Sequence, residues 1–286
     1  MTRSDWFPVA SLAAAALALG TAAFVGASTA DADPARTAPA VSPPGRDAAP
    51  GDADLDDNLD VNLDDGATAD PATDPATVVA DAAAAMGAVT SVEFRLARDG
   101  APVFVDQFES IAVDAAVGQF TVATAASAGG AAATLDVTVD GNLRTRIGAV
   151  AIGSEVWMSN PVTGRFETLP AGYDIDPSRF FDPRGGWQPL LEHLTDVELV
   201  GVDARGGARW HVRATAPAAD VANITVGLVE DQDVVVDLWV HPGSSLVTAM
   251  EFDTELESGG TVGTAHWTLE LARYGESFTI EPPEGL

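Results

Sequence analysis

The sequence contains no cysteine, and its 14 basic residues other than histidine are all arginine. Without cysteine, a disulfide framework, a thiolate metal site and a cysteine nucleophile are excluded. The 14 basic residues stand against 43 acidic ones, which gives a net charge of -29. A surface this acidic repels nucleic acids and anionic membranes. We therefore expect no nucleic acid among the partners, and the compartment has to be inferred from the N-terminus.

The N-terminus carries Arg3 and then an uncharged, alanine-rich run over residues 7–27. Ala30-Asp31-Ala32 supplies the small residues that a signal peptidase needs. The run is also just long enough to cross a bilayer. We predict that residues 1–27 are a signal peptide or a membrane anchor. The chain is expected to be exported to the outer side of the cytoplasmic membrane or the cell envelope, either anchored or secreted.

Residues 28–74 are rich in Pro, Ala and Asp and have almost no aromatic residue, which predicts a disordered acidic linker. Residues 52–66 superficially resemble a calcium loop, but they lack its central glycine and its closing glutamate. An acidic spacer fits them better, and the sequence predicts neither a metal site nor a cofactor. Residues 75–286 are long enough for one domain with a sizeable core.

From about residue 89 to residue 280, apolar and polar residues alternate in short runs separated by turns. This pattern predicts an antiparallel sheet of about ten strands with one wet face. Asp99-Gly100 is interpreted as a hairpin turn toward Val103 and Val105, and Asp140-Gly141 as another. The expected strand runs are Val92 to Leu96, Phe120 to Thr124, Leu135 to Val139, Leu143 to Ala149, Val197 and Leu199, Trp210 to Ala214, Val234 to Val240, Leu246 to Phe252 and Ala265 to Leu271.

Three segments favour helices. Asp74-Pro75 is an N-cap followed by proline, and apolar residues then recur at helical spacing as far as Gly87. Residues 217–228 form a second candidate, and residues 176–194 a third that Gly185-Gly186 interrupts. So large a sheet must curl, and its apolar face needs a cover. The aromatic and leucine-rich segment 176–194 either completes the core or roofs an elongated apolar cavity, with Gly185-Gly186 as the expected hinge.

Four stretches carry a resemblance to a known family: Glu155-Val-Trp-Met158, Gly164-Arg-Phe-Glu167, residues 173–183 and residues 190–196. Their order and spacing resemble the actinobacterial LppX/LprAFG lipoproteins, and the likeness extends over about residues 75–283. The resemblance implies an α+β fold: a strongly curved antiparallel β half-barrel like that of the carriers LolA and LolB, with helices covering the concave face. Family members are usually lipidated on a cysteine. Here Ser28 replaces it, so any anchoring must come from the apolar N-terminal segment.

The function that this resemblance implies is that of an exported envelope protein. It would sequester the acyl chains of a lipid or lipoglycan in a hydrophobic cavity and carry them between membrane and envelope, with a membrane lipid transporter as a further candidate partner. The alternative is a non-catalytic envelope scaffold, or a protein-interaction domain, with a filled core. The residues expected to line the cavity and its lid are Phe94, Leu135, Val137, Ile147, Met158, Phe180, Phe181, Trp187, Leu190, Leu191, Leu194, Val221, Ile224, Leu228, Val236, Leu238, Met250, Phe252, Trp267 and Leu269.

The four histidines give no support to an enzyme. They fall in different expected elements, and none lies in an HExxH or Gly-x-Ser-x-Gly setting. His211 and His266 belong to the polar face of the sheet, where a solvated side chain is expected. His193 lies near a helix end, where it suits the negative end of the helix dipole. We predict no catalytic residue.

Overall fold

The structure is a computed structural model that describes residues 67–104, 111–124, 128–153, 155–160, 163–168, 185–203, 207–224, 229, 231–258 and 261–284, without the side chains of residues 224, 257, 258 and 261. Eleven strands form one sheet. In chain order the elements are α2 (Pro75–Gly87), β1 (Ser91–Gly100), β2 (Ile111–Thr121), β3 (Gly130–Val139), β4 (Leu143–Ile152), β5 (Glu155–Ser159), β6 (Phe166–Thr168), α3 (Trp187–Glu192), β7 (Thr195–Asp203), β8 (Arg209–Ala216), α4 (Ala218–Ile224), β9 (Val234–Val240), β10 (Val247–Ser258) and β11 (Thr261–Ala272).

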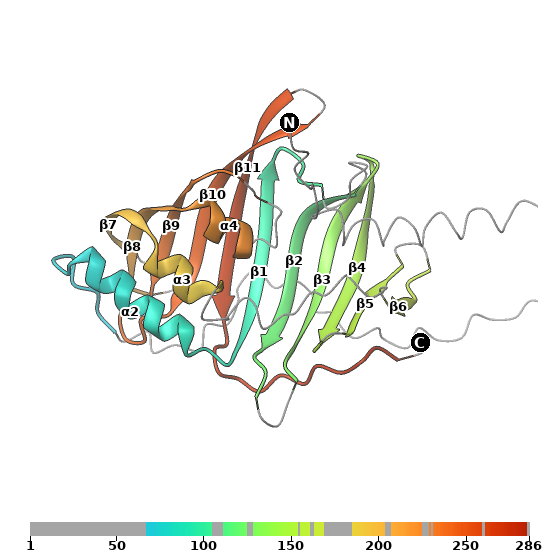
Figure 1. Ribbon diagram of the computed structural model, residues 1–286, viewed down its shortest axis with the longest axis horizontal. Helices are drawn as coiled ribbons and strands as arrows, with labels where there is room; N and C mark the ends of the chain where they lie inside the picture. The colour runs from blue at the N-terminus through green and yellow to red at the C-terminus, as the bar shows by residue number, and fades with distance from the viewer. Residues whose placement is uncertain are drawn as a thin grey trace, which may run out of the picture.

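The sheet is antiparallel throughout, in the order β6-β5-β4-β3-β2-β1-β11-β10-β9-β8-β7 (Figure 1). The chain builds one half outward from β1 to β6, and it builds the other half inward from β7 to β11. The first and last strands then pair in the middle, from Glu93 with Ala272 to Gly100 with Ala265. The predicted class, a strongly curved and unclosed antiparallel sheet with helices on its apolar face, is confirmed, with one strand more than the ten expected.

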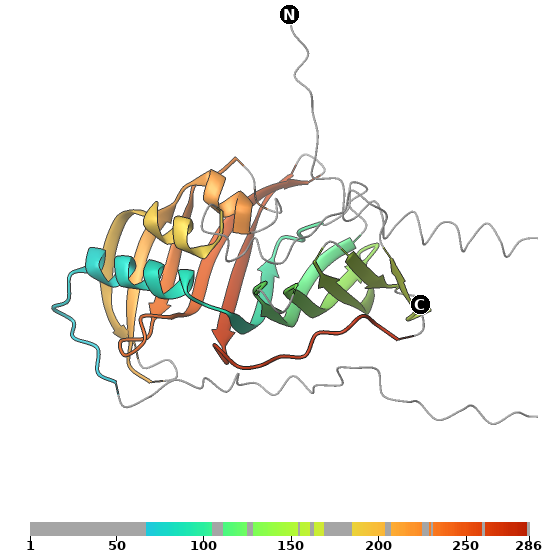
Figure 2. The same ribbon diagram turned by 60° about the horizontal axis from the view of Figure 1, so that its bottom comes forward.

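The described helices lie over the β7 to β11 half of the sheet, as two views agree (Figures 1 and 2). Helix α2 begins as predicted: the Asp74 carboxylate accepts a hydrogen bond from the Ala76 N–H, and Pro75 occupies the first position. Its buried residues are the five that the helical spacing selected: Val78, Val79, Ala82, Ala83 and Met86. Helix α4 ends at Ile224, and residues 225–228 of the predicted helix lie outside the described part.

The two predicted turns had opposite outcomes. Asp140 and Gly141 do link β3 to β4, and both take positive φ angles, 49° and 71°. The predicted hairpin at Asp99-Gly100 is wrong, because both residues belong to β1 and pair with His266 and Ala265 of β11. The connection therefore comes later, and β2 begins only at Ile111.

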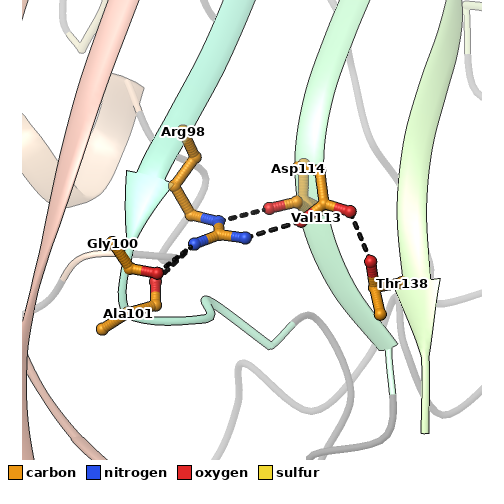
Figure 3. A network of polar contacts seen from close by, with 6 residues as sticks. All are labelled: Arg98, Gly100, Ala101, Val113, Asp114 and Thr138. Carbon is orange, nitrogen blue, oxygen red and sulfur yellow. Dashed lines mark hydrogen bonds and ion pairs between the residues drawn. The ribbon is translucent and has the colours of Figure 1, made fainter. Parts of the chain in front are cut away.

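Strands β1 and β2 separate at this end of the sheet. Their pairing stops at Ala97 and Ala115, beside a bulge that leaves Asp114 without a direct partner in β3. Arg98 bridges the separation (Figure 3): its Nε donates to the Val113 carbonyl at 2.7 Å, and its Nη1 donates to the carbonyls of Gly100 and Ala101. Its Nη2 contacts Asp114 at 2.6 Å. One guanidinium thus satisfies three backbone carbonyls where the direct pairing of the two strands stops.

After β11 the chain runs along the ends of the strands toward β6 (Figure 2). The Gly275 N–H donates to the Ser91 carbonyl at 3.0 Å, and the Ser91 hydroxyl donates to the Glu276 carbonyl at 2.6 Å. Further along, Ile280 lies against Gly130 at the start of β3. The C-terminal segment, residues 275–280, therefore contacts the start of both β1 and β3. No helix in the described part of the chain has the length and apolar character needed to cross a membrane.

The open sheet has two edges, formed by β6 and β7. Strand β6 is only three residues long. Strand β7 pairs with β8 through two register shifts, one between Thr195 and Glu198 and one between Leu199 and Gly201. Both edges are therefore irregular or short.

Candidate functional site

One face of the sheet carries an unbroken row of apolar residues, which we call the apolar row. Each member pairs directly with the next across neighbouring strands, so all of them point to the same face. The row runs through Leu199, Val212, Leu238, Met250, Leu269, Leu96, Ala116, Leu135 and Ile147. It therefore crosses the sheet from β7 to β4 without a polar side chain.

The described helices lie over only part of this face. Trp187, Leu190 and Leu191 of α3 are 4%, 1% and 1% exposed, and they share one core cluster with the buried residues of α2 and with β8 to β11. Within that cluster Phe94, Leu96 and Leu269 are only partly buried. The cover is thus closely packed where α3 meets this cluster, whereas these three residues of β1 and β11 are less completely covered.

A second cluster occupies the other half of the face. Ile111, Val113, Val137 and Ile147 are its buried members, and Leu135, Val139 and Met158 pack against it while partly exposed. All of these residues come from β2 to β5. The apolar face therefore continues well beyond the described helices.

Between the two clusters, the strands carry three residues with very small side chains on the apolar face. Gly118, Ala133 and Ala149 pair with one another in sequence across β2, β3 and β4. This small-residue floor is bounded by Phe94 on the β1 side and by Met158 on the β5 side. A Cβ on Gly118 would lie 2.8 Å from the Phe94 ring, so the ring reaches over the glycine. Both alanines are half-buried.

The structure brings most of the predicted lining residues to this face. Phe94, Val236, Leu238, Met250, Phe252, Trp267 and Leu269 join the helical residues Trp187, Leu190, Leu191 and Val221, and Leu194 just after α3, in the first cluster. Leu135, Val137, Ile147 and Met158 form much of the second. Phe180, Phe181 and Leu228, and the side chain of Ile224, lie outside the described residues. Gly185 and Gly186 directly precede α3, and their role as a hinge stays a prediction.

Several residues of the face were not on the predicted list. Met86 and its neighbours in α2 are buried against the sheet, although their helical spacing had already marked them as apolar. The small-residue floor was also missed, because glycine and alanine give no hydrophobic signal in a strand. Only the register of β2, β3 and β4 reveals that these residues adjoin.

Tyr274 packs against the first cluster near the start of β10. Its hydroxyl donates to the Val247 carbonyl and lies 3.8 Å from the Met86 sulfur. Burial raises the pKa of Tyr274 well above the ordinary value of 10.0. The hydroxyl therefore stays neutral in the folded domain at pH values where an unfolded chain already ionises.

Alkaline pH is expected to destabilise the domain through Tyr274. The contribution of a neutral Tyr274 is fully present below about pH 10, and it is lost above that value by up to about 1.4 kcal/mol per pH unit. The measurement is urea unfolding at intervals from pH 9 to pH 11.5, with Tyr274→Phe as the comparison. The variant should lose stability less steeply, and identical slopes in the two proteins would contradict the assignment.

The opposite face is polar and carries two of the histidines. His266 is exposed and contacts Asp253 at 2.7 Å, as a solvated residue can. His211 differs from the expectation, because it contacts Asp237 at 2.6 Å and stacks on Trp239 with 4.6 Å between ring centroids. His193 ends α3 and contacts Asp220 of α4 at 2.9 Å. Among the described residues no group of three or more His, Asp and Glu is placed to hold a metal ion.

A curved, unclosed sheet with helices on its apolar face defines a class of open half-barrels. The sequence model of the LppX_LprAFG lipoprotein family matches residues 74–280, and the chain belongs to this family. LprF of Mycobacterium bovis has a similar structure, with a TM-score of 0.59, 16% identity, and coverage of 76% of this chain and 100% of LprF. LppX of Mycobacterium tuberculosis has a TM-score of 0.49 and 16% identity, with coverage of 74% of this chain and 100% of LppX. No curated protein sequence matches the chain.

Proposed function

We propose that this protein is an exported lipid-binding protein of the cell envelope. It takes up the acyl chains of a lipid or lipoglycan on its apolar face and carries or transfers them between membrane and envelope. Membership of the LppX_LprAFG lipoprotein family supports this function. The observation that carries it is the apolar row, which extends from β7 to β4 although the described helices lie over only the β7 to β11 half.

The small-residue floor is the place where an acyl chain fits this face best. Ala133 and Ala149 carry only methyl side chains, and Leu135 and Met158 offer partly exposed apolar walls. Each methylene removed from water contributes about 0.8 kcal/mol, so ten of them contribute about 8 kcal/mol before the entropic cost of binding. No chemical step is needed, and the protein acts by sequestration.

Attachment to the membrane is proposed to rest on residues 7–27. Ser28 stands where the lipidated cysteine of the family is expected, so no thioether can form there. An uncleaved apolar segment then holds the domain near the membrane, whereas a cleaved one releases it into the envelope. Neither arrangement changes the proposed lipid-binding face.

A scaffold with a filled core is the second candidate function. The observation in its favour is the close packing of the cover, where Leu190 and Leu191 are each 1% exposed. In this case the helices and the sheet form an ordinary core, and the apolar face has no room for a ligand.

Extraction of bound lipid separates the two functions. The full-length chain is exported by a bacterial host, purified without detergent, and extracted with organic solvent for mass spectrometry. We expect a diacyl lipid or lipoglycan at near-stoichiometric amount, since bound chains leave an apolar site slowly. A lipid-free protein that also fails to take up a fluorescent fatty acid would favour the scaffold.

A further inference from the structure

Two adjoining hollows lie where β1 and β2 separate. The larger has a volume of about 530 Å³ and the smaller of about 320 Å³, and both are lined by Arg98, Asp114 and Arg144. Neither is lined by a residue of the first core cluster. Val137 of the second cluster lines the larger hollow, but Gly118, Ala133 and Ala149 of the small-residue floor line neither of them.

The shared wall of the hollows is held rigidly. The Arg98 side chain is 8% exposed and has four hydrogen-bonded oxygens around it, one of them on Asp114. The other oxygen of Asp114 accepts a hydrogen bond from the Thr138 hydroxyl at 2.5 Å (Figure 3). These two side chains are therefore occupied with each other and with the backbone, and they give the hollows a preorganised shape.

The rim of the larger hollow offers groups that a ligand can reach. Asp99 and Arg144 are exposed, and within the described part of the chain no hydrogen bond or ion pair is found for either side chain. Asp136 and Arg146 also line the hollow and contact each other at 2.9 Å. The rim thus presents carboxylate acceptors and guanidinium donors side by side.

The charges in the larger hollow cancel. Arg98, Arg144 and Arg146 are balanced by Asp99, Asp114 and Asp136. An anion would meet three carboxylates in a chain whose net charge is -29, and a cation would meet three guanidinium groups. A neutral ligand with many hydroxyls can instead donate to the carboxylates and accept from the arginines.

The smaller hollow adds an apolar wall. Phe104, Pro102 and Ala112 line it beside Asn142 and Thr138. An aromatic ring and a proline suit the C–H face of a sugar ring, while the amide and hydroxyl suit its hydroxyls. The combined size of the two hollows falls within the range of small-molecule sites.

From these observations we infer that the hollows at the separation of β1 and β2 form a binding site for neutral carbohydrate. Asp99 and Arg144 contact the hydroxyls, and Phe104 contacts the ring. A free glycan and the sugar part of a glycolipid offer the same hydroxyls, so both fit the site. The inference does not depend on lipid binding at the floor, because no residue of the floor lines either hollow.

Saturation-transfer NMR with purified full-length protein tests the site. The probes are trehalose, maltose and cellobiose, with dodecyl maltoside as the lipid-linked form of maltose and inorganic phosphate as the anion. We expect at least one disaccharide to bind with a dissociation constant of about 1 to 10 mM, as is usual for a small and open site. Binding should weaken at least fivefold in Asp99→Asn and in Arg144→Gln.

The matched control is Arg165→Gln, which changes an exposed arginine outside both hollows and should bind like the unchanged protein. If only dodecyl maltoside binds, and its binding weakens in Arg144→Gln, the site is assigned to glycolipids. If dodecyl maltoside binds Asp99→Asn and Arg144→Gln as tightly as the unchanged protein, its binding is due to the acyl site alone. The inference would be overturned by that result, by binding of phosphate alone, or by a failure of both the disaccharides, at about 50 mM, and dodecyl maltoside to bind.

Discussion

Replacing Ala133 by phenylalanine is expected to weaken lipid binding about a hundredfold. Ala133 lies at the centre of the small-residue floor, between Gly118 and Ala149. A phenyl ring there occupies the space of about four methylenes, whose contribution of about 3 kcal/mol is lost from the complex. Lipid retained on the purified variant, and its affinity for a fluorescent fatty acid, measure the effect.

The neighbouring Ala132 supplies the matched control. It belongs to the same strand and is also half-buried, but it pairs with Gln119 and Val150 and therefore points to the opposite face. Ala132→Phe should leave lipid binding unchanged. If Ala133→Phe instead costs about 1 to 3 kcal/mol of folding stability, the floor is already filled and the scaffold function gains support.

Replacing Trp187 by alanine is expected to cost about 3 to 5 kcal/mol of folding stability. The indole is 4% exposed at the start of α3, within the cluster that α2 and the β8 to β11 strands share. A loss of this size should lower the melting temperature of the domain by roughly 10 °C. Thermal unfolding followed by circular dichroism provides the measurement.

Glu192 at the end of the same helix is exposed, and Glu192→Ala should change stability by less than about 0.5 kcal/mol. A small effect of Trp187→Ala would instead mean that α3 rests loosely on the sheet. The comparison therefore measures how firmly the cover is seated, which decides whether it must move for lipid to enter.

The side of the sheet on which each residue lies was largely predictable. Alternation places Phe94, Leu135, Val236 and Trp267 on one face wherever a strand keeps its period, and the pairing of the strands confirms it. The start of α2 was predictable for a similar reason, since the Asp74 cap and the apolar spacing are both local. Local signals of this kind need no knowledge of the partner strand.

What the sequence could not reveal depends on distant partners. The bulge at Asp114 shifts the alternation within β2, so that strand was recognised only near its end. The pair Asp99-Gly100 has the composition of a turn, but pairing with β11 keeps it within β1. The hollows beside Arg98 arise from the bulge at Asp114 together with the pairing of Asp99-Gly100 with β11. No local sequence pattern predicts them.

The two edges of the sheet have a further consequence. An unclosed sheet offers free backbone groups to any extended chain, including another copy of the same protein. Strand β6 is too short to act as a template, and the register shifts of β7, with Asp196 and Glu198 beside them, spoil the straight ladder that an incoming strand needs. The protein can therefore keep an open sheet with a partly exposed apolar face while its edges resist strand-to-strand association.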